Sequence, residues 1–200
     1  MPNGLVKLSS GTGFCSGVRI APTIVLSAKH FLRHTLPRDI RISAPFDNVD
    51  SFCTISGWIG IPHTDIAVVA APLPDDHSFT NVATVPISST SLRLADRTIS
   101  VGLGGGASVI KPGWVIGTLP FACGKNIHTR VRHAAVLAQR DPAVRGDSGG
   151  PILIDGKVYA LQSMILEPFG HNIGCATVAQ IAPVARKIYS AMNQLQQRLA

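Results

Sequence analysis

Short apolar or alternating segments of strand length recur along almost the whole chain of 200 residues, and they constrain its fold most strongly. Proline, glycine, asparagine and aspartate interrupt these segments, which is typical of antiparallel strands joined by turns. The dipeptide Asp155-Gly156 between two apolar runs predicts a hairpin turn. The strand-like segments are 4–10, 11–20, 23–28, 40–44, 53–60, 65–73, 98–105, 114–122, 126–136, 149–165 and 172–180.

Only the C-terminus has a long helical pattern, and a shorter helical turn is expected directly after His30. The apolar residues at three- and four-residue steps are Val184, Ile188, Met192, Leu195 and Leu199. Two similar sets of strands separated by a polar stretch predict an all-β fold of two six-stranded antiparallel β-barrels, with the C-terminal helix added. The predicted boundaries are 1–85 for the first barrel, 86–97 for the linker, 98–182 for the second barrel and 183–200 for the helix.

Composition limits the classes of function. The chain is 46% hydrophobic and 14% charged, so a packed core is expected and wholesale disorder is not. No apolar run is long enough for a transmembrane helix, no signal peptide is visible, and no metal-ligand spacing or cofactor motif occurs. The net charge of +7 suits an acidic partner, although the basic residues are scattered. The densest basic stretch, 125–140, alternates enough to be interpreted as a solvated strand face. Weak nucleic-acid binding through this basic surface, or a scaffold role, is therefore the competing non-enzymatic hypothesis, and nothing indicates an oligomeric state.

Ser148 lies in the segment "VRGDSGGPIL" (144–153), where it is surrounded by glycines and an aspartate. The segment is either a tight turn into a strand, or a nucleophile held on that turn with exposed amides beside it. A nucleophilic serine needs a base, and the base needs a third group that fixes its tautomer. His30 at the end of one apolar strand and Asp65 at the start of another are the candidates. Because they belong to the first half and Ser148 to the second, we expect an active site between the barrels.

Two other histidines compete for the role of base. His34 is one helical turn beyond His30 and is interpreted as an exposed residue, whereas His63 lacks a motif around it. The letters "GDSGG" also fit the G-x-S-x-G turn of α/β-hydrolases, which requires an acid and then a histidine after the serine. Only His171 follows Ser148, and the alternating helices of that fold are missing, so the α/β-hydrolase alternative is disfavoured.

Several motifs, in the same chain order, resemble those of chymotrypsin-like serine proteases of the trypsin fold. "GFCSG" resembles "FCGG", "VLSAKHF" resembles "VLTAAHC", "TDIAVV" resembles "DIALL", and "VYALQSM" resembles "VGIVSWG". "GDSGGP" matches the family's nucleophile motif letter for letter. The resemblance extends over about residues 11–199. It implies a serine endopeptidase that acts on a polypeptide substrate through an acyl-enzyme and needs no cofactor.

The resemblance also implies a role for each matching residue. His30 is the general base, Asp65 orients it, and Ser148 attacks the scissile carbonyl. The amides of Gly146 and Ser148 form the oxyanion hole. Ser163 takes the place of the serine that supports the aspartate.

The substrate pocket is less defined. The family's specificity position corresponds to Pro142, and a slip of one residue gives Asp141 instead. Viral relatives that select Gln or Glu carry a histidine before the position of Ser163, where this chain has Gln162. His171 is either a loop residue or part of the pocket. These residues leave the cleavage preference open.

Two departures from the secreted relatives indicate a different branch. The expected disulfide partner of Cys15 is Phe31, and Val144 stands in place of another cysteine, so we expect all four cysteines to be free thiols. No "IVGG" N-terminus is present to supply the amine that pairs with the acid before the nucleophile, so Asp147 needs another partner, or substrate organises the oxyanion hole. Both departures favour an intracellular, cytoplasmic protease in a reducing environment. A viral polyprotein-processing protease in the host cytoplasm is favoured over a cellular high-temperature-requirement-type or other intracellular protease.

Overall fold

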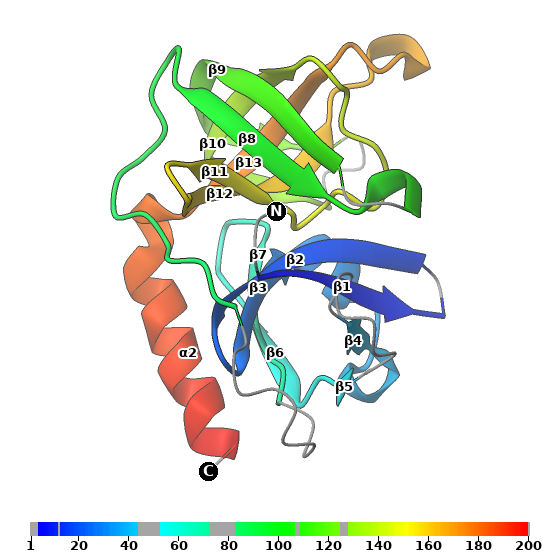
Figure 1. Ribbon diagram of the computed structural model, residues 1–200, viewed down its shortest axis with the longest axis vertical. Helices are drawn as coiled ribbons and strands as arrows, with labels where there is room; N and C mark the ends of the chain where they lie inside the picture. Colours follow the sequence, from blue (N-terminus) through cyan, green and yellow to red (C-terminus); the bar gives the residue numbers. More distant parts are fainter. Residues whose placement is uncertain are drawn as a thin grey trace.

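The computed structural model describes residues 4–11, 13–43, 53–72, 83–106, 109–124 and 128–199. Its strands form two groups, one above the other in Figure 1, and a long helix runs along the side. The first group contains β1 (Leu5–Ser10), β2 (Gly13–Ala21), β3 (Ile24–Ala28), α1 (Lys29–Leu32), β4 (Arg41–Ser43), β5 (Cys53–Thr54), β6 (Gly57–Gly60) and β7 (Ile66–Ala70). The second contains β8 (Arg97–Gly102), β9 (Val109–Cys123), β10 (Arg130–Gln139), β11 (Pro151–Ile154), β12 (Lys157–Ile165) and β13 (Cys175–Gln180), followed by α2 (Ala185–Leu199). Short 3-10 turns occupy Pro37–Asp39, Gly104–Gly106, Pro168–Gly170 and Ala182–Val184.

The first group forms one curled antiparallel sheet in the order β5-β4-β1-β2-β3-β7-β6. Strands β3 and β7 are buried along their whole length, which explains why their sequences are continuous apolar runs. The prediction for this half was a closed six-stranded barrel; the sheet has seven strands, and within the described residues it ends at β5 and β6 without closing. The predicted segment 53–60 divides because the amide of Ile55 bonds back to the carbonyl of Ile40, after which the chain leaves β4 to pair with β7.

The second group closes into a barrel in the order β10-β13-β12-β11-β8-β9. This confirms the predicted six-stranded antiparallel barrel, and the chain as a whole has the predicted two-barrel, mostly β fold. Asp155 and Gly156 form the hairpin turn between β11 and β12 with φ values of 48° and 73°, the positive values that a two-residue turn requires. Strand β9 begins earlier than the predicted segment 114–122 because its first residues pair with β8.

The two halves share one apolar core. Leu26 of β3 and Val68 of β7 belong to the same buried cluster as Leu161 of the barrel. The connecting segment is also tied to the first sheet, because the amide of Val85 donates to the carbonyl of Arg19 at 2.9 Å. The two halves therefore pack against each other through this shared cluster, which fixes the relative position of side chains at the seam.

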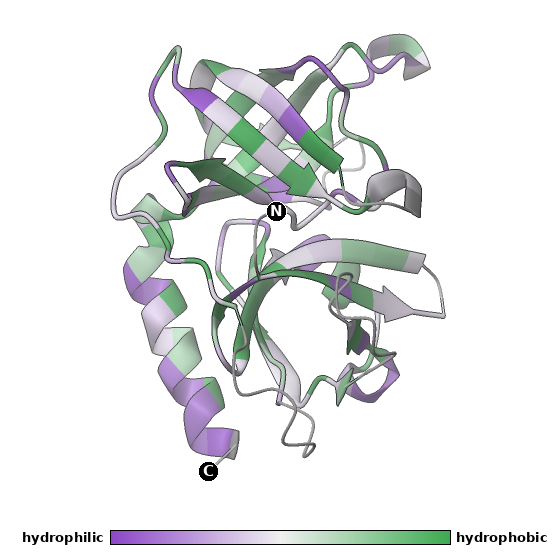
Figure 2. Cartoon of the chain, viewed as in Figure 1, coloured by the Kyte–Doolittle hydropathy of each residue, from purple (hydrophilic) through white to green (hydrophobic). Residues whose placement is uncertain are grey.

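Helix α2 follows the barrel in sequence and packs against β6 and β7 of the other half. Its buried residues include Ile188 and Leu195, two of the positions in the predicted apolar stripe. Figure 2 shows hydrophobic and hydrophilic residues interspersed along this helix, as expected when one face packs and the other faces water. In the described part of the chain, no helix is long and apolar enough to cross a membrane.

Candidate active site

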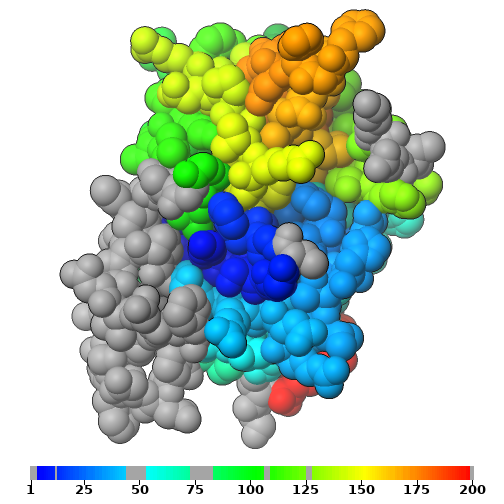
Figure 3. Space-filling model, turned by 90° about the vertical axis from the view of Figure 1, so that its right-hand side faces the viewer, coloured from blue at the N-terminus to red at the C-terminus, as the bar shows by residue number. Residues whose placement is uncertain are grey.

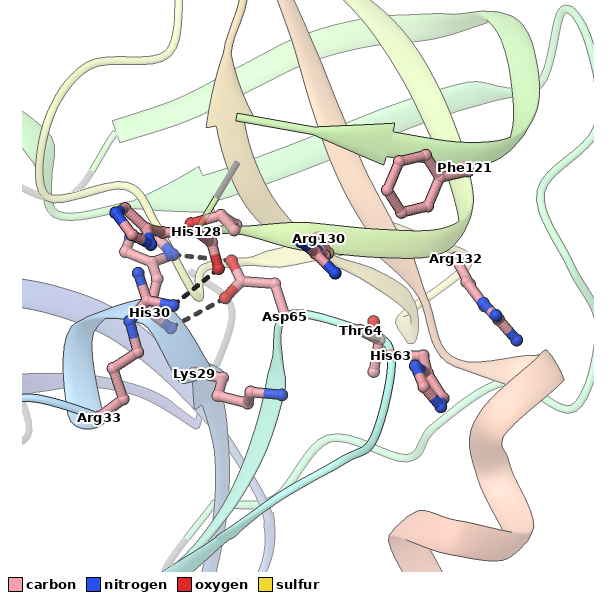
Figure 4. A pocket seen from close by; sticks show the side chains of 11 residues that line it. Lys29, His30, Arg33, His63, Thr64, Asp65, Phe121, His128, Arg130 and Arg132 are labelled. Carbon is pink, nitrogen blue, oxygen red and sulfur yellow. Dashed lines mark hydrogen bonds and ion pairs between the residues drawn. The ribbon is translucent and has the colours of Figure 1, made fainter. Parts of the chain in front are cut away.

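His30 and Asp65 meet because the strands that carry them are paired. Ala28 at the end of β3 lies opposite Ile66 at the start of β7, so the residues just beyond both positions lie at the same end of the sheet. Nδ1 of His30 lies 2.7 Å from Oδ2 of Asp65, and the amide of His30 donates to Oδ1 at 2.8 Å (Figure 4). Since a carboxylate only accepts, the bond places a proton on Nδ1 and leaves the lone pair on Nε2.

The second barrel supplies a further contact to this carboxylate. Ser163 on β12 donates its hydroxyl to Oδ2 of Asp65 at 2.6 Å. Both side chains are buried, so the hydrogen bonds offset the cost of taking the carboxylate out of water. The same bond joins the two halves at the seam.

Ser148 lies on a turn that packs closely against the first sheet. Gly146 and Gly149 have φ values of 101° and 80°, in the region that favours glycine. A Cβ at Gly149 would lie 2.3 Å from the carbonyl oxygen of Ser16 and 2.6 Å from the amide nitrogen of Ala28. The amide of Ser16 also donates to the carbonyl of Ser148 at 2.9 Å. Figure 3 shows the yellow segment that contains this turn directly beside the blue N-terminal strands.

Backbone contacts also place the turn of Ser148 against the strand that carries Ser163. The amide of Gly149 donates to the carbonyl of Gln162 at 2.7 Å, and the next residue along β12 is the serine that binds Asp65. Within the described residues, neither Oγ of Ser148 nor Nε2 of His30 makes a hydrogen bond. Catalytic hydrogen bonds often tighten only when substrate is bound.

Two backbone amides beside Ser148 are available to an acceptor. In the described part of the chain, the amides of Gly146 and Ser148 donate to no protein group. The carbonyl of Gly146 accepts from the hydroxyl of Ser16 at 2.7 Å, and that hydroxyl accepts from the amide of Leu103 at 2.9 Å. These two hydrogen bonds of Ser16 therefore hold the carbonyl group of Gly146 in place. The sequence contained this residue in "GFCSG" but indicated no role for it.

Asp147 is held by a lysine that the sequence analysis missed. Nζ of Lys111 on β9 lies 2.5 Å from Oδ2 of Asp147 and 3.0 Å from the carbonyl oxygen of Pro142. The amides of Gly104 and Val144 donate to the same carboxylate at 2.8 and 2.9 Å. Lys111 is 4% exposed, at an inward position of an alternating strand. The alternation of the strand, which puts a lysine at an inward position, is the sequence signal that could have identified this buried counterion.

The predicted pocket residues lie in different environments. Asp141 and Pro142 are exposed on the loop before Ser148, and His171 is exposed on another loop. Gln162 is buried, and in the described structure its Oε1 has no hydrogen-bond partner. The structure thus brings the predicted Ser163 to the site and leaves Asp141 and His171 at the surface.

The rival histidines do not contact Asp65. His34 is exposed, and its ring accepts from Nε of Arg33 at 3.0 Å. His63 is exposed on the turn before Asp65, with a φ of 62°. Neither residue is placed to act on the serine through this aspartate.

A cavity of about 310 Å³ opens beside His30 at the seam between the barrels (Figure 4). Most of the residues that line it are lysine, arginine or histidine. The lining as a whole is Lys29, His30, Arg33, His63, Thr64, Asp65, Phe121, His128, Thr129, Arg130 and Arg132. The sequence analysis interpreted the basic stretch over 125–140 as a solvated strand face and did not predict this cavity.

The four cysteines, Cys15, Cys53, Cys123 and Cys175, are free thiols in the structure. Burial raises the pKa of Cys15 to about 12, although a contact of 3.2 Å with the hydroxyl of Ser27 opposes the change. Burial also raises the pKa of Cys53. Among the described residues, no cluster of histidine, cysteine and acidic side chains is arranged to hold a metal ion.

A two-barrel fold that carries a histidine–aspartate pair on one half and a serine in "GDSGGP" on the other defines the class of chymotrypsin-like serine proteases. The sequence profile of the trypsin family matches residues 3–187, and the chain therefore belongs to the trypsin family. No curated protein sequence matches it.

Solved structures with a similar fold come from several branches of the class. The active form of the Rv3671c protease from M. tuberculosis is 15% identical, with a TM-score of 0.74 over 95% of this chain and 81% of that one. The HtrA-type protease AlgW is 17% identical, with a TM-score of 0.74 over 94% of this chain and 60% of that one. Kallikrein-related peptidase 10 is 17% identical, with a TM-score of 0.73 over 95% of both chains. These likenesses concern the fold.

Proposed function

We propose that the chain is a serine endopeptidase in which Ser148 is the nucleophile, His30 the general base and Asp65 the residue that orients the base. A fold alone does not establish an activity, so the proposal depends on the site. The observation that carries it is the hydrogen bond between His30 and Asp65, whose carboxylate also accepts from Ser163 of the second barrel. Among the described residues, the hydroxyl of Ser148 makes no hydrogen bond.

In the acylation step, Nε2 of His30 removes the hydroxyl proton as Oγ of Ser148 attacks the scissile carbonyl. The positive charge that forms on the imidazole is stabilised by Asp65 through the 2.7 Å bond. The imidazolium then gives its proton to the leaving amine, and an acyl-enzyme remains. Water attacks the ester by the same sequence in reverse, which regenerates Ser148.

The negative oxygen of each tetrahedral intermediate is received by the amides of Gly146 and Ser148. Neither N–H group donates to another described residue, so no hydrogen bond among these residues is broken when the oxyanion forms. A single donor of this kind contributes about 10²- to 10³-fold in kcat.

A fluorophosphonate probe and a peptide library test the proposal together. We expect the wild type to be labelled at Ser148 and to cleave internal peptide bonds, and Ser148→Ala to lose both properties. The loss in kcat should be about 10⁶-fold, since the triad acts as a unit. Equal labelling of the wild type and Ser148→Ala would show that another residue is the nucleophile.

The cellular setting is a further part of the proposal. The four free thiols support a reducing compartment such as the cytoplasm. Viral polyprotein processing remains our finer proposal, supported by the sequence pattern, and the bacterial origin of the Rv3671c protease supports the cellular alternative. Cleavage at the ends of this chain within a longer precursor, absent in Ser148→Ala, is expected for a polyprotein protease and not for the cellular one.

A further inference from the structure

The cavity beside His30 concentrates positive charge next to the site of catalysis. Lys29 reaches it from α1 and Arg33 from the residue directly after α1, and Arg130 and Arg132 reach it from β10 in the other half. We refer to this cavity as the basic pocket. Figure 4 shows these side chains arranged around it, with His30 at one end.

Contacts with the backbone fix the basic pocket in place. Nη1 of Arg33 donates to the carbonyl of His128 at 2.7 Å, which joins α1 to the second barrel. The amide of Arg132 donates to the carbonyl of His63 at 2.8 Å. The pocket is therefore part of the seam itself, built from both halves.

Among the described lining residues of the pocket, Lys29, Arg33 and Arg132 outnumber the acidic side chains. Asp65 is the only acidic side chain among the described residues that line it. Both oxygens of that carboxylate are already occupied, by the amide and ring of His30 and by the hydroxyl of Ser163. Side chains that hold positive charge near a half-enclosed cavity attract an anionic ligand.

Resting on the proposed endopeptidase function, we propose that the basic pocket binds acidic side chains, Asp or Glu, of the polypeptide substrate within a few residues of the scissile bond. The pocket shares His30 with the proposed catalytic site, so a side chain bound in it lies next to the general base. Its volume of about 310 Å³ accommodates one or two side chains. A nucleic-acid duplex would need an extended basic surface instead.

Peptides that differ only in Glu, Gln or Lys at each position around the scissile bond test this proposal. We expect at least one position where Glu exceeds Gln by about tenfold in kcat/KM, the lower end of the effect of charge focusing in clefts. The ratio should fall toward one in Arg132→Gln and in Arg33→Gln/Arg132→Gln. It should also fall when salt is raised, because ions screen the attraction.

Arg132→Gln is the more informative variant, because Arg33 also holds the carbonyl of His128. The matched control is Arg41→Gln/Arg198→Gln, which removes two exposed charges on β4 and α2 and should leave the Glu-to-Gln ratio unchanged. Equal cleavage of Glu and Gln peptides by a wild type that is labelled at Ser148 would overturn the pocket proposal alone. A ratio that Arg132→Gln does not change would overturn it as well.

Binding to Ser148→Ala separates the pocket from catalysis. Fluorescence anisotropy should show tighter binding of the Glu peptide than of the Gln peptide, and Arg132→Gln in the same background should remove the difference. This result would support the pocket even if no peptide were cleaved, whereas equal binding would overturn it. A single-stranded DNA 12-mer that binds more tightly than the Glu peptide, and loses affinity in Arg132→Gln, would assign the pocket to nucleic acid and overturn the proposal.

Discussion

Replacing Lys111 with methionine tests how the turn around Ser148 is held. Nζ of Lys111 lies 2.5 Å from Oδ2 of Asp147, and both side chains are only 5% exposed. Methionine keeps an unbranched apolar side chain and removes the charge, so Asp147 becomes a buried carboxylate without a cation. Breaking one side of a buried ion pair costs about 3–5 kcal/mol.

The remaining hydrogen bonds place the expected cost at the lower end. The amides of Gly104 and Val144 still donate to Asp147, so the free energy of unfolding should fall by about 3 kcal/mol. Asp147 directly precedes Ser148, and the same penalty favours conformations in which the turn and its amides are displaced. If the whole penalty of about 3 kcal/mol falls on the active conformation of the turn, the rate of reaction at Ser148 should fall about a hundredfold.

Urea denaturation in the Ser148→Ala background measures the free energy of unfolding without self-digestion. In variants that keep Ser148, the rate of fluorophosphonate labelling measures how much of the protein has the turn in its active conformation. Lys157→Met, which removes an exposed lysine at the start of β12, is the matched control. Lys111→Met/Asp147→Asn should recover part of the lost stability, because no unpaired charge remains. If Lys111→Met equalled Lys157→Met in stability and labelling rate, the argument that Asp147 needs a buried cation would be refuted.

Three other changes test separate parts of the site. Asp65→Asn removes the acceptor that sets the His30 tautomer, so kcat should fall by about 10⁴-fold, as in related triads, while circular dichroism stays unchanged. Gly149→Ala forces a side chain into a contact of 2.3 Å at a φ of 80°, and a loss of at least about 2 kcal/mol in urea denaturation is expected; a fully stable variant would contradict the close approach. Cys15 has its pKa raised from 9.0 to about 12 by burial, so the native protein should resist alkylation at this thiol until it unfolds. Because the unfolded thiol ionises first, this contribution to stability should be present below pH 9 and disappear as the pH rises toward 12, as a melting series with Cys15→Ala as control would show.

The backbone conformation of the turn that carries Ser148 could be predicted from the sequence. Gly146 and Gly149 are each needed for a positive φ and for a close approach, of Gly146 to the ring of Phe14 and of Gly149 to the backbone of Ser16. A requirement of this kind can be met only by glycine, so it is visible in the sequence. The strand segments, the Asp155-Gly156 hairpin and the C-terminal helix were predicted for the same reason, since hydrophobic period and turn chemistry act over a few residues. The two strand sets predicted the two-barrel fold, and the family motifs added the roles of His30, Asp65 and Ser148.

Other features depended on which strands became neighbours. The sequence did not indicate that the first sheet has seven strands, because the division at Ile55 follows from pairing with two different partners. It did not identify Lys111 as the partner of Asp147, since the two residues meet only when β9 closes against the turn. Long-range contacts of this kind are specified by packing and not by local pattern.

The basic pocket is a second feature that the sequence alone did not predict. Its arginines looked like a solvated strand face, because a period of two in sequence does not reveal what lies opposite the exposed side of a strand. That face becomes the wall of a cavity beside His30 because Arg132 of β10 bonds to His63 before β7, and because Arg33 bonds to His128 just before β10. The roles of the catalytic residues could thus be predicted from their sequence motifs. The positive charge around them could not, because it depends on which side chains the packing of the two barrels brings together.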